Sequence, residues 1–409
     1  METKSKSPIL TTLATPAFWL AIIINIVANM AGSCLGQPVN LEANNLGMSA
    51  TLIGFVASCY TVCALLIRTP FGTVLDTSRK PTMVLFISNI FTALVYLGFA
   101  VCNSVPFYIV LRLLHGFTFG MRNMAMSVVL AKGVDKKAFG TAMGLLTLIP
   151  KIFSSITTKI TLWITGTAGI EYVAYAGAAL AVLAGVLCLF LKMDNSGAQG
   201  GGKAGGKKRV FYFRALPVIV IFAILQIPSL ASNNFIVLYG ADANLADAAA
   251  TYASNQKLWM GIAGFICGYL VDKLDIKGAK WVSTVVLAIA AGAGIMVGLS
   301  QNTNIWLISG ILCGIGAGGS GIFRTVTLRE SSASVRALAV GSFAMAQDLV
   351  SIFSSTVIGV LADRIGYSMT FVFLGALPII GIVLTLFGFE KFIGMLQDKN
   401  APATETQNE

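Results

Sequence analysis

Positively charged side chains stand inside long apolar stretches of this chain, where a charge is expensive to place. Lys151 and Lys159 interrupt the stretch TLIPKIFSSITTKITLW at residues 147–163, and Lys151 directly follows a proline. A charge at the centre of a membrane-spanning helix costs about 2.5–3.5 kcal/mol on insertion scales. Other bases that lie deep in apolar stretches are Arg112, Arg122 and Lys257.

Acidic residues do not balance these bases. Asp348, in the stretch AMAQDLVSIF, is the one acid placed deep in an apolar stretch of the sequence. A cavity with excess positive charge is costly when empty and is stabilised by a bound anion. The residue types therefore favour recognition of an anion, and an alternative is that Asp348 simply neutralises one of the lysines.

Spacing and depth distinguish the two lysines of the first stretch. At a rise of about 1.5 Å per residue, Lys151 lies near the middle of its stretch and Lys159 lies about 12 Å nearer the outside. Lys151, Ser155, Thr158 and Lys159 follow the spacing of one helix face. Lys151 is the stronger candidate, because Lys159 is close enough to the interface for its ammonium group to reach water.

Uncharged polar residues extend the list of candidates. Asn25, Asn29, Ser33 and Gln37 recur every four residues, which predicts one polar stripe on a helix. Hydrogen bonding between neighbouring helices is the alternative explanation for the stripe. A second polar group consists of Gln226, Ser229, Asn233 and Asn234, near Pro228. His115 is the single histidine, and it either relays protons or packs with a local hydrogen bond.

The elements that carry these residues are predicted to be membrane-spanning helices. Of the 409 residues, 56% are hydrophobic and 11% are charged, whereas soluble domains carry about 25% charged residues. About 20 apolar residues are needed for each span, and lipid requires that spans be helical or form closed barrels. The predicted spans are 17–38, 49–69, 82–102, 105–130, 138–162, 172–191, 210–235, 250–271, 281–299, 304–326, 337–360 and 367–390. We therefore expect an all-α membrane protein with twelve transmembrane helices.

The distribution of lysine and arginine predicts the orientation. With the N-terminus inside, almost all loop bases are cytoplasmic, and Arg364 is the one base in the outside loops. This pattern predicts a multi-pass protein of the plasma (inner) membrane with both termini in the cytoplasm. It also accounts for most of the net charge of +11, and bases scattered over separate loops do not resemble a nucleic-acid surface.

The chain divides into two similar halves. A Gly- and Lys-rich cytoplasmic linker at 193–209 separates an N-terminal six-helix bundle, 17–192, from a C-terminal one, 210–391. The flanking tails are 1–16 and 392–409. GTVLD at 72–76 recurs as GYLVD at 268–272, and IFSS at 152–155 recurs at 352–355. A duplicated, pseudo-symmetric unit is expected to bind its substrate between the halves, near the middle of the membrane.

The sequence does not support a disulfide framework, a metal site or a nucleotide-binding site. The seven cysteines form neither a disulfide framework nor a zinc spacing. GIGAGGSG at 314–321 lies in an apolar span, where close helix packing explains it better than dinucleotide binding. A Walker motif is absent, so ATP is not expected to be the direct energy source. We expect no cofactor, no metal, no enzymatic activity and no nucleic-acid partner.

Two loops and one span resemble the major facilitator superfamily. Its loop pattern Gly-x-x-x-Asp-(Arg/Lys)-x-Gly-(Arg/Lys)-(Arg/Lys) is matched in part after the second span, and the repeat copy follows the eighth span. Span four also carries the family's Arg-x-x-x-Gly as Arg112 and Gly116. The matching loop residues are Gly72, Asp76, Arg79 and Lys80, and then Gly268, Asp272 and Lys273. Thr77 stands where the family has a base, and the second glycine of the first loop is missing.

This resemblance implies a fold and a mode of action. In the family, spans one, four, seven and ten line a cavity, and spans five and eight adjoin across the two halves, which would bring Arg122, Lys151 and Lys257 towards one chamber. The matched loop residues would form a cytoplasmic gate. The candidates for substrate binding or coupling are Arg122, Lys151, Lys257, Asp348, Arg112, Lys159, Asn25, Asn29 and Gln226.

The predicted function is secondary transport by alternating access. We expect a small organic anion of the carboxylate type as substrate, moved by symport or exchange with a proton or a counter-anion. The alternative is proton-coupled multidrug efflux. The family's antiporter signature Gly-Pro-x-x-Gly-Gly is missing in span five, where Lys151 and Phe153 follow Pro150, and this argues against the alternative. The partners are then the small-molecule substrate and the lipid bilayer, and the protein is expected to be a monomer.

Overall fold

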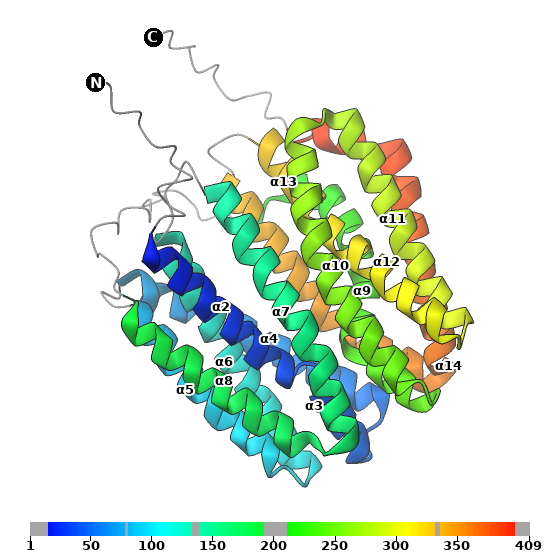
Figure 1. Cartoon of the computed structure of the whole chain (residues 1–409). Helices are drawn as coiled ribbons and strands as arrows, with labels where there is room; N and C mark the ends of the chain where they lie inside the picture. Colours follow the sequence, from blue (N-terminus) through cyan, green and yellow to red (C-terminus); the bar gives the residue numbers. More distant parts are fainter. Residues whose placement is uncertain (1–14, 78–80, 133–138, 192–210, 332–335, 397–409) are drawn as a thin grey trace, which may run out of the picture.

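The computed structural model describes residues 15–77, 81–132, 139–191, 211–331 and 336–396, and this part of the chain is helical with no strand. The first half contains α2 (Pro16–Cys34), α3 (Pro38–Asn45), α4 (Ala50–Thr77), α5 (Pro81–Ala100), α6 (Val105–Lys132), α7 (Phe139–Thr167) and α8 (Ile170–Phe190). The second half contains the short 3-10 helix η2 (Phe213–Ala215), α9 (Leu216–Asp242), α10 (Ala246–Lys273), α11 (Ile276–Leu299), α12 (Thr303–Gly319), α13 (Gly321–Glu330) and α14 (Arg336–Gly394). Figure 1 shows the halves as two helical bundles side by side, with α7 next to α10 at their junction.

The described helices group into twelve segments, which agrees with the number of predicted spans. The helix α14 holds two of them, because Gly366 breaks it with φ 77° and ψ 162°. The pairs α2–α3 and α12–α13 each make one crossing. Eight stretches of the described chain have the length and the apolar composition of a membrane span. Helices α6, α7 and α10, which carry the buried bases, are not among the eight.

The first predicted span differs from the structure at its end. Instead of continuing to residue 38, α2 ends at Cys34, and α3 begins at Pro38. The chain leaves helical geometry at Leu35, and Pro38 begins α3, in whose first turn the missing backbone N–H of proline costs nothing. Gln37 is therefore not part of the predicted continuous stripe, although it stays close to it. The predicted linker at 193–209 lies outside the described residues.

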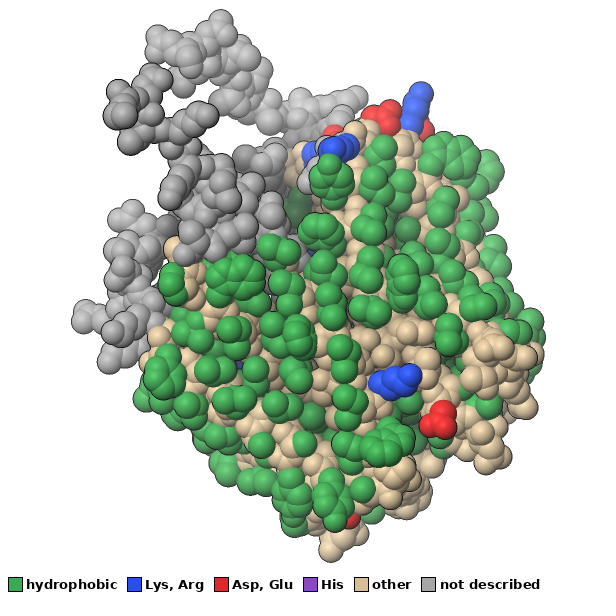
Figure 2. All heavy atoms as spheres, in the orientation of Figure 1, with side chains coloured by type: hydrophobic (Ala, Val, Ile, Leu, Met, Phe, Trp, Pro, Cys, Tyr) green, Lys and Arg blue, Asp and Glu red, His purple; other side chains and the backbone are tan. Residues whose placement is uncertain are grey.

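Apolar side chains cover the face of the molecule in Figure 2, and basic and acidic side chains gather mainly at its upper edge. Large exposed residues on the helices include Phe91, Leu183, Phe265 and Phe373. A soluble protein rarely exposes an apolar surface of this extent. The surface is that of an integral, multi-pass membrane protein.

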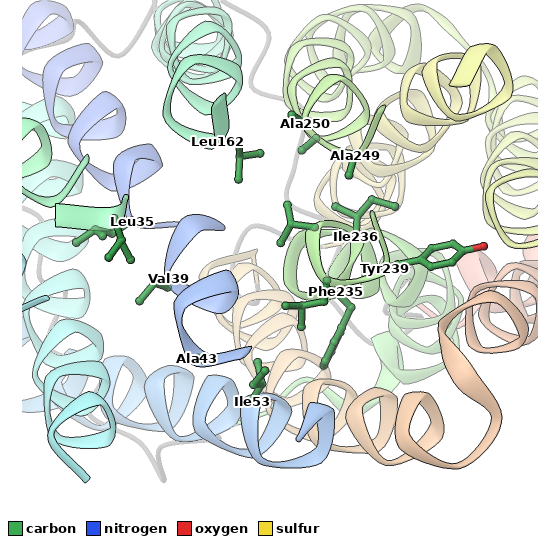
Figure 3. Close-up of a cluster of buried hydrophobic side chains, with 14 of the residues drawn as sticks. Leu35, Val39, Ala43, Ile53, Leu162, Phe235, Ile236, Tyr239, Ala249 and Ala250 are labelled. Atoms are coloured by element: carbon green, nitrogen blue, oxygen red, sulfur yellow. The ribbon is translucent and has the colours of Figure 1, made fainter. Parts of the chain in front are cut away.

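We call the end of the bundle at which α2 begins and α14 ends the inner end, and the opposite end the outer end. At the outer end, one cluster of buried residues joins both halves. Figure 3 shows Val39, Ile53 and Leu162 of the first half facing Phe235 and Ala249 of the second. At the inner end, the described residues form two separate clusters. One cluster belongs to α2, α5, α6 and α8, and the other to α9, α10, α11, α13 and α14.

Glycines bring the helices of the two halves into backbone contact at the outer end. A Cβ atom on Gly54 of α4 would overlap the carbonyl oxygen of Ser355 of α14. A Cβ atom on Gly359 of α14 would likewise overlap the carbonyl oxygen of Ala50. Helices approach this closely only where a side chain is absent, so the outer closure depends on these glycines.

Asp363 adds a polar contact to this closure. Its carboxylate accepts hydrogen bonds from the backbone N–H groups of Ala50 at 3.0 Å and Thr51 at 2.8 Å. It therefore caps the N-terminus of a helix that belongs to the other half. Asp363 lies between the two crossings of α14, outside both predicted spans. Burial acts to raise the pKa of this carboxyl group, but the hydrogen bonds from Thr51 and Ala50 hold the pKa below its ordinary value.

Candidate functional site

A cavity of about 320 Å³ lies between the two halves, on the inner side of the outer closure. Its lining comes from α2, α4, α6 and α7 of the first half, from α9, α10 and α14 of the second, and from the break between α2 and α3. The lining residues are Asn29, Gly32, Ser33, Gly36, Gln37, Ala57, Tyr60, Thr61, Arg112, His115, Phe119, Arg122, Lys151, Ser154, Leu230, Asn233, Asn234, Lys257, Ser351 and Ser355. Four of the described lining side chains are basic, and none is acidic.

One face of α6 supplies two of the bases. Arg112, His115, Phe119 and Arg122 are spaced by three, four and three residues, so they share a helix face. Both arginines are only 6% exposed. Gly116, one turn after Arg112, packs directly on the backbone carbonyl of Tyr60 in α4. This close approach holds the basic face of α6 towards the cavity.

The two arginines are fixed by neutral partners. The Nη2 atom of Arg112 donates to Asn40 Oδ1 at 3.1 Å, and its guanidinium lies 5.1 Å from the centre of the Tyr60 ring. The Nη1 atom of Arg122 donates to the backbone oxygen of Ala28 at 3.1 Å. Neither partner carries a negative charge, so the positive charge of both side chains remains available to an anion.

Lys151 and Lys257 approach each other from α7 and α10. Lys257 Nζ donates to Thr158 Oγ1 at 2.6 Å, across the junction of the halves. Gly261, one turn after Lys257, leaves room for Lys151, since a Cβ atom on Gly261 would lie 2.8 Å from the Lys151 Cβ atom. Within the described part of the chain, no hydrogen bond or ion pair involves Lys151. The two lysines thus form a second basic group, held by direct helix packing.

The wall from the second half is mostly neutral and polar. Asn234 Nδ2 donates to Ser355 Oγ at 3.0 Å, and the backbone oxygen of Asn234 accepts from Asn40 Nδ2 at 2.9 Å. Asn233 and Ser351 are the other neutral polar residues of this wall, and Leu230 is its apolar one. Asn40 therefore links Arg112 of the first half to α9 of the second, and the polar network crosses the interface.

Three lining residues hold buried polar atoms that lack a partner. Gln37 is 2% exposed, and both its Nε2 and its Oε1 atoms are unpaired. The Nε atom of Arg112 and the Nδ1 atom of His115 are also unpaired. Buried polar atoms are nearly always hydrogen-bonded. Their gathering around one cavity is typical of a site that receives a polar ligand.

Five of the predicted binding residues line this cavity, namely Arg112, Arg122, Lys151, Lys257 and Asn29. Helix α7 nevertheless separates its two lysines. Ser155 and Thr158 are buried against α10, whereas Lys159 is exposed and lines another pocket with Trp163 and Asp247. Eight residues rotate a helix by about 80° beyond two full turns and advance it by about 12 Å. Lys159 therefore lies on a different side of α7 from Lys151 and nearer the outer end.

The other predicted binding residues lie elsewhere. Asn25 accepts a hydrogen bond from Asn29 but is not part of the described lining. Gln226 donates to Ser320 at 3.2 Å, which ties α9 to the start of α13. Asp348 is partly buried outside the described lining and has an interaction of its own. The expectation that span ten lines the cavity is also not met by the described lining. Glycines of α12 pack instead on α10, as Gly310 does on the backbone of Tyr252.

The proposed gate falls largely outside what the structure describes. The side chains of Gly72, Asp76 and Asp272 are not described, nor are residues 78–80, which include Arg79 and Lys80. At the end of α10, Lys273 Nζ lies 4.4 Å from the centre of the Tyr269 ring, and Gly268 is partly buried. The gate therefore stays a prediction.

Sequence reasoning missed several residues of the site. Tyr60, Phe119, Ser351 and Ser355 belong to helices whose pattern gives no sign of which face is inward. His115 is a candidate proton relay by its residue type, but its place in the cavity follows from the packing of α6. The repeated IFSS motif was the one available signal, because it contains Ser154 in one copy and Ser355 in the other.

Comparisons with known proteins agree with this architecture. The sequence profile described as Major Facilitator Superfamily matches residues 11–355 and 258–405. No curated protein sequence is significantly similar to the chain.

Three solved structures illustrate the similarity of the fold. A bacterial homologue of the human lysosomal transporter Spinster, in an inward-facing and occupied conformation, has a TM-score of 0.76 at 12% identity, with coverage of 97% of this chain and 100% of that one. The nucleoside transporter NupG has a TM-score of 0.69 at 16% identity, over 94% and 100% of the chains. The human organic anion transporter MFSD10 has a TM-score of 0.61 at 12% identity, over 92% and 99%. With a profile match along nearly its whole length and the twelve-crossing fold in place, the chain belongs to the major facilitator superfamily of transporters.

Proposed function

We propose that this transporter carries a small organic anion of the carboxylate type by alternating access, through symport or exchange. One observation carries the proposal, namely that Arg112, Arg122, Lys151 and Lys257 line one cavity between the halves with no acidic side chain in its described lining. Removing a charge from water costs several kcal/mol unless a counter-charge is supplied. A bound carboxylate supplies that counter-charge.

The cavity matches a small ligand in size and in polarity. Its volume of about 320 Å³ falls at the lower end of the range typical of small-molecule sites. Lys151 and Lys257 are the expected carboxylate ligands, because they lie closest to the junction of the halves. Arg112 and Arg122 can each offer two parallel N–H groups to an anion. The amides of Asn233 and Asn234 would then hydrogen-bond the neutral part of the substrate.

The shape of the interface supports alternating access. The outer end is sealed by a cluster shared between the halves, whereas the described inner clusters each belong to one half. This arrangement fits an inward-facing state, which is also the conformation of the Spinster homologue. The reverse state would require the outer cluster to part and the loops with Gly72, Asp76, Gly268 and Asp272 to close. We place the inner end, with both termini, in the cytoplasm, and the protein in the plasma membrane.

Multidrug efflux, the alternative function, fits this cavity less well. A lipophilic cation would enter a chamber whose described charges are all positive, and like charges repel strongly at low effective dielectric. Among the proteins of similar fold, MFSD10 is an organic anion transporter, which is compatible with our proposal, whereas NupG is a nucleoside transporter. The substrate class therefore rests on the four bases.

A ligand screen by thermal shift on the purified protein tests the proposal. The probes are succinate, gluconate, aspartate, inorganic phosphate, glucose and tetraphenylphosphonium. At least one carboxylate should raise the melting temperature, because a ligand at about 100 times its Kd stabilises by about 2.7 kcal/mol. Lys151→Gln and Lys257→Gln should remove this shift, and the control Lys159→Gln, on the exposed side of α7, should keep it. Stabilisation by tetraphenylphosphonium alone would show that the anion proposal is wrong.

A further inference from the structure

His115 occupies a position in the cavity that anion binding alone does not explain. It is 4% exposed, it lines the cavity, and it lies on the face of α6 between Arg112 and Arg122. Three aromatic rings surround its imidazole in edge-on contact. They belong to Tyr60 at 5.1 Å, Tyr96 at 5.2 Å and Phe99 at 6.2 Å between ring centres.

The hydrogen bonding of His115 leaves one ring nitrogen unused. Its Nε2 atom lies 3.3 Å from the hydroxyl oxygen of Tyr96. Its Nδ1 atom is buried and has no partner. Histidine changes its charge near neutral pH, and both ring nitrogens are donors once it is protonated. A protonated His115 therefore needs an acceptor at Nδ1 that the empty cavity does not provide.

The charged and titratable groups around His115 decide when that proton can bind. Its own helix contributes Arg112 and Arg122, α4 contributes Tyr60 and α5 contributes Tyr96. The same cavity receives Lys151 from α7 and Lys257 from α10, whereas no titratable side chain of α2, α9 or α14 is in the described lining. All the fixed charges in this set are positive. An imidazolium in the empty cavity would add another positive charge to four, so the ring is expected to be neutral there.

We propose that His115 binds the co-transported proton, and that it does so together with the substrate anion. The inference rests on the proposed anion transport and adds its coupling ion. A carboxylate in the cavity offsets the bases and supplies an acceptor for the Nδ1–H group of the imidazolium. Linkage is reciprocal, so the proton strengthens anion binding by the same factor as the anion strengthens proton binding.

The coupling follows from this linkage. With a proton and an anion both bound, the cavity carries no more positive charge than when empty, and the halves can rearrange around a filled site. With a proton alone, the cavity carries five positive charges close together. The loaded and the empty forms are therefore the two that exchange between inner and outer access, and one proton moves with each anion in the same direction.

Transport by the full-length protein in proteoliposomes tests this. Succinate, gluconate and aspartate serve as labelled probes, and protein-free vesicles correct for leakage. For a carried probe, net uptake should rise about tenfold when the external pH falls from about 8 to about 6, because each anion enters together with one proton and proton binding strengthens anion binding. His115→Gln, which keeps an amide near Tyr96, should lose this dependence. Counterflow by the wild type, which needs no net proton movement, identifies which probes are carried. The control Lys159→Gln, on the exposed side of α7, should keep the pH dependence of the wild type.

A binding measurement without any variant complements transport, in case His115→Gln folds poorly. Adding a carried probe to weakly buffered wild-type protein near neutral pH should take up about one proton per site, followed with an indicator dye. Unchanged pH dependence in His115→Gln, or proton uptake that Lys257→Gln removes and His115→Gln does not, would overturn the inference. Probe flux with no proton movement would also overturn it while leaving anion transport intact. If none of the probes moves in counterflow, the proposed substrate class is wrong, and this outcome is distinct from a failure of the inference about His115.

Discussion

The two ends of the interface between the halves differ in how they are held together. At the outer end, α4 meets α14 through backbone contacts at Gly54 and Gly359, and one apolar cluster includes both halves. At the inner end, each half keeps an apolar cluster to itself among the described residues. Each half therefore has an apolar cluster of its own at the inner end, whereas the packing at the outer end is shared. The outer contacts then select one conformation of the pair.

The largest effects are expected from removing a buried phenylalanine. Such variants distinguish a loss of folding stability from an opening of the outer end. Phe235, in the shared outer cluster, and Phe323, in the inner cluster of the second half, are both fully buried. Replacing either by alanine should lower the free energy of unfolding by about 3–5 kcal/mol. Phe235→Ala should also open the outer end, measured by labelling of a cysteine placed beside Ile53, whereas Phe323→Ala should not. Equal labelling in both variants would show that the outer cluster does not differ from the inner cluster in holding the outer end closed.

A glycine substitution at the outer end should have the next largest effect. Gly54→Val places a side chain where the backbone of Ser355 lies, and overpacking costs about 1–3 kcal/mol. This corresponds to a shift of about fivefold to about 140-fold away from the outer-closed state, since 1.4 kcal/mol is a factor of ten. Spin-label distances between the outer ends of α4 and α14 measure the shift.

The control for that substitution is Gly341→Val, because a Cβ atom at Gly341 meets no atom within 4 Å. The distance distribution of this variant should match the wild type. An unshifted distribution in Gly54→Val would mean that the close approach of α4 to α14 does not hold the outer end closed.

Asp363→Asn should weaken the outer closure to a smaller extent. The substitution keeps the shape of the side chain but removes the negative charge at the N-terminus of α4. Because the site is exposed, we expect a loss of about 0.5–1 kcal/mol, or about a twofold to fivefold shift in the same spin-label distances. The exposed residue Asp242, at the end of α9, provides a control, and Asp242→Asn should leave the distances unchanged.

The outer closure should respond to pH only under strongly acidic conditions. The pKa of Asp363 lies below its ordinary value of 3.8, so its contribution is fully present above about pH 4 and is lost as the pH falls through the lowered pKa. The spin-label distances of the wild type should therefore be constant between about pH 8 and about pH 5. A transition centred in that interval that persists in Asp363→Asn would assign the pH response to another group.

The smallest effect is expected for an ion pair at the inner end. Lys280 and Glu390 lie 3.3 Å apart within the second half, and their side chains are 21% and 51% exposed. Exposed ion pairs contribute about 0–1 kcal/mol, and this pair does not cross the interface. Lys280→Ala should change neither the melting temperature nor the outer distances beyond error. A clear shift in the distances would show that the inner end also takes part in the closure.

Much of the architecture follows from the sequence because its determinants are local or compositional. Apolar stretches of about 20 residues must form helices in lipid, whatever surrounds them. The repeat of GTVLD and IFSS reflects a duplicated bundle, and the excess of bases over acids inside spans is visible without any coordinates. The start of a new helix at Pro38 could also have been predicted from the sequence, because proline is favoured in the first turn of a helix.

The sequence by itself determined that this protein crosses the membrane repeatedly, that it has two similar halves, and that buried positive charge needs a partner. The sequence did not determine which basic side chains lie close together in the cavity. Lys151 and Lys159 lie on one helix, yet the packing of α7 on α10 brings Lys151 into the cavity and leaves Lys159 exposed.

Only the tertiary structure decided that His115 lies between two arginines at the cavity and that Gln37 is buried without a partner. It also decided that Asp348 lies away from the described lining. The physical reason is that a membrane helix is apolar around most of its circumference. Which face turns inward therefore depends on the contacts of small residues between helices, as at Gly116 and Gly261, and these contacts join segments that are distant in the chain.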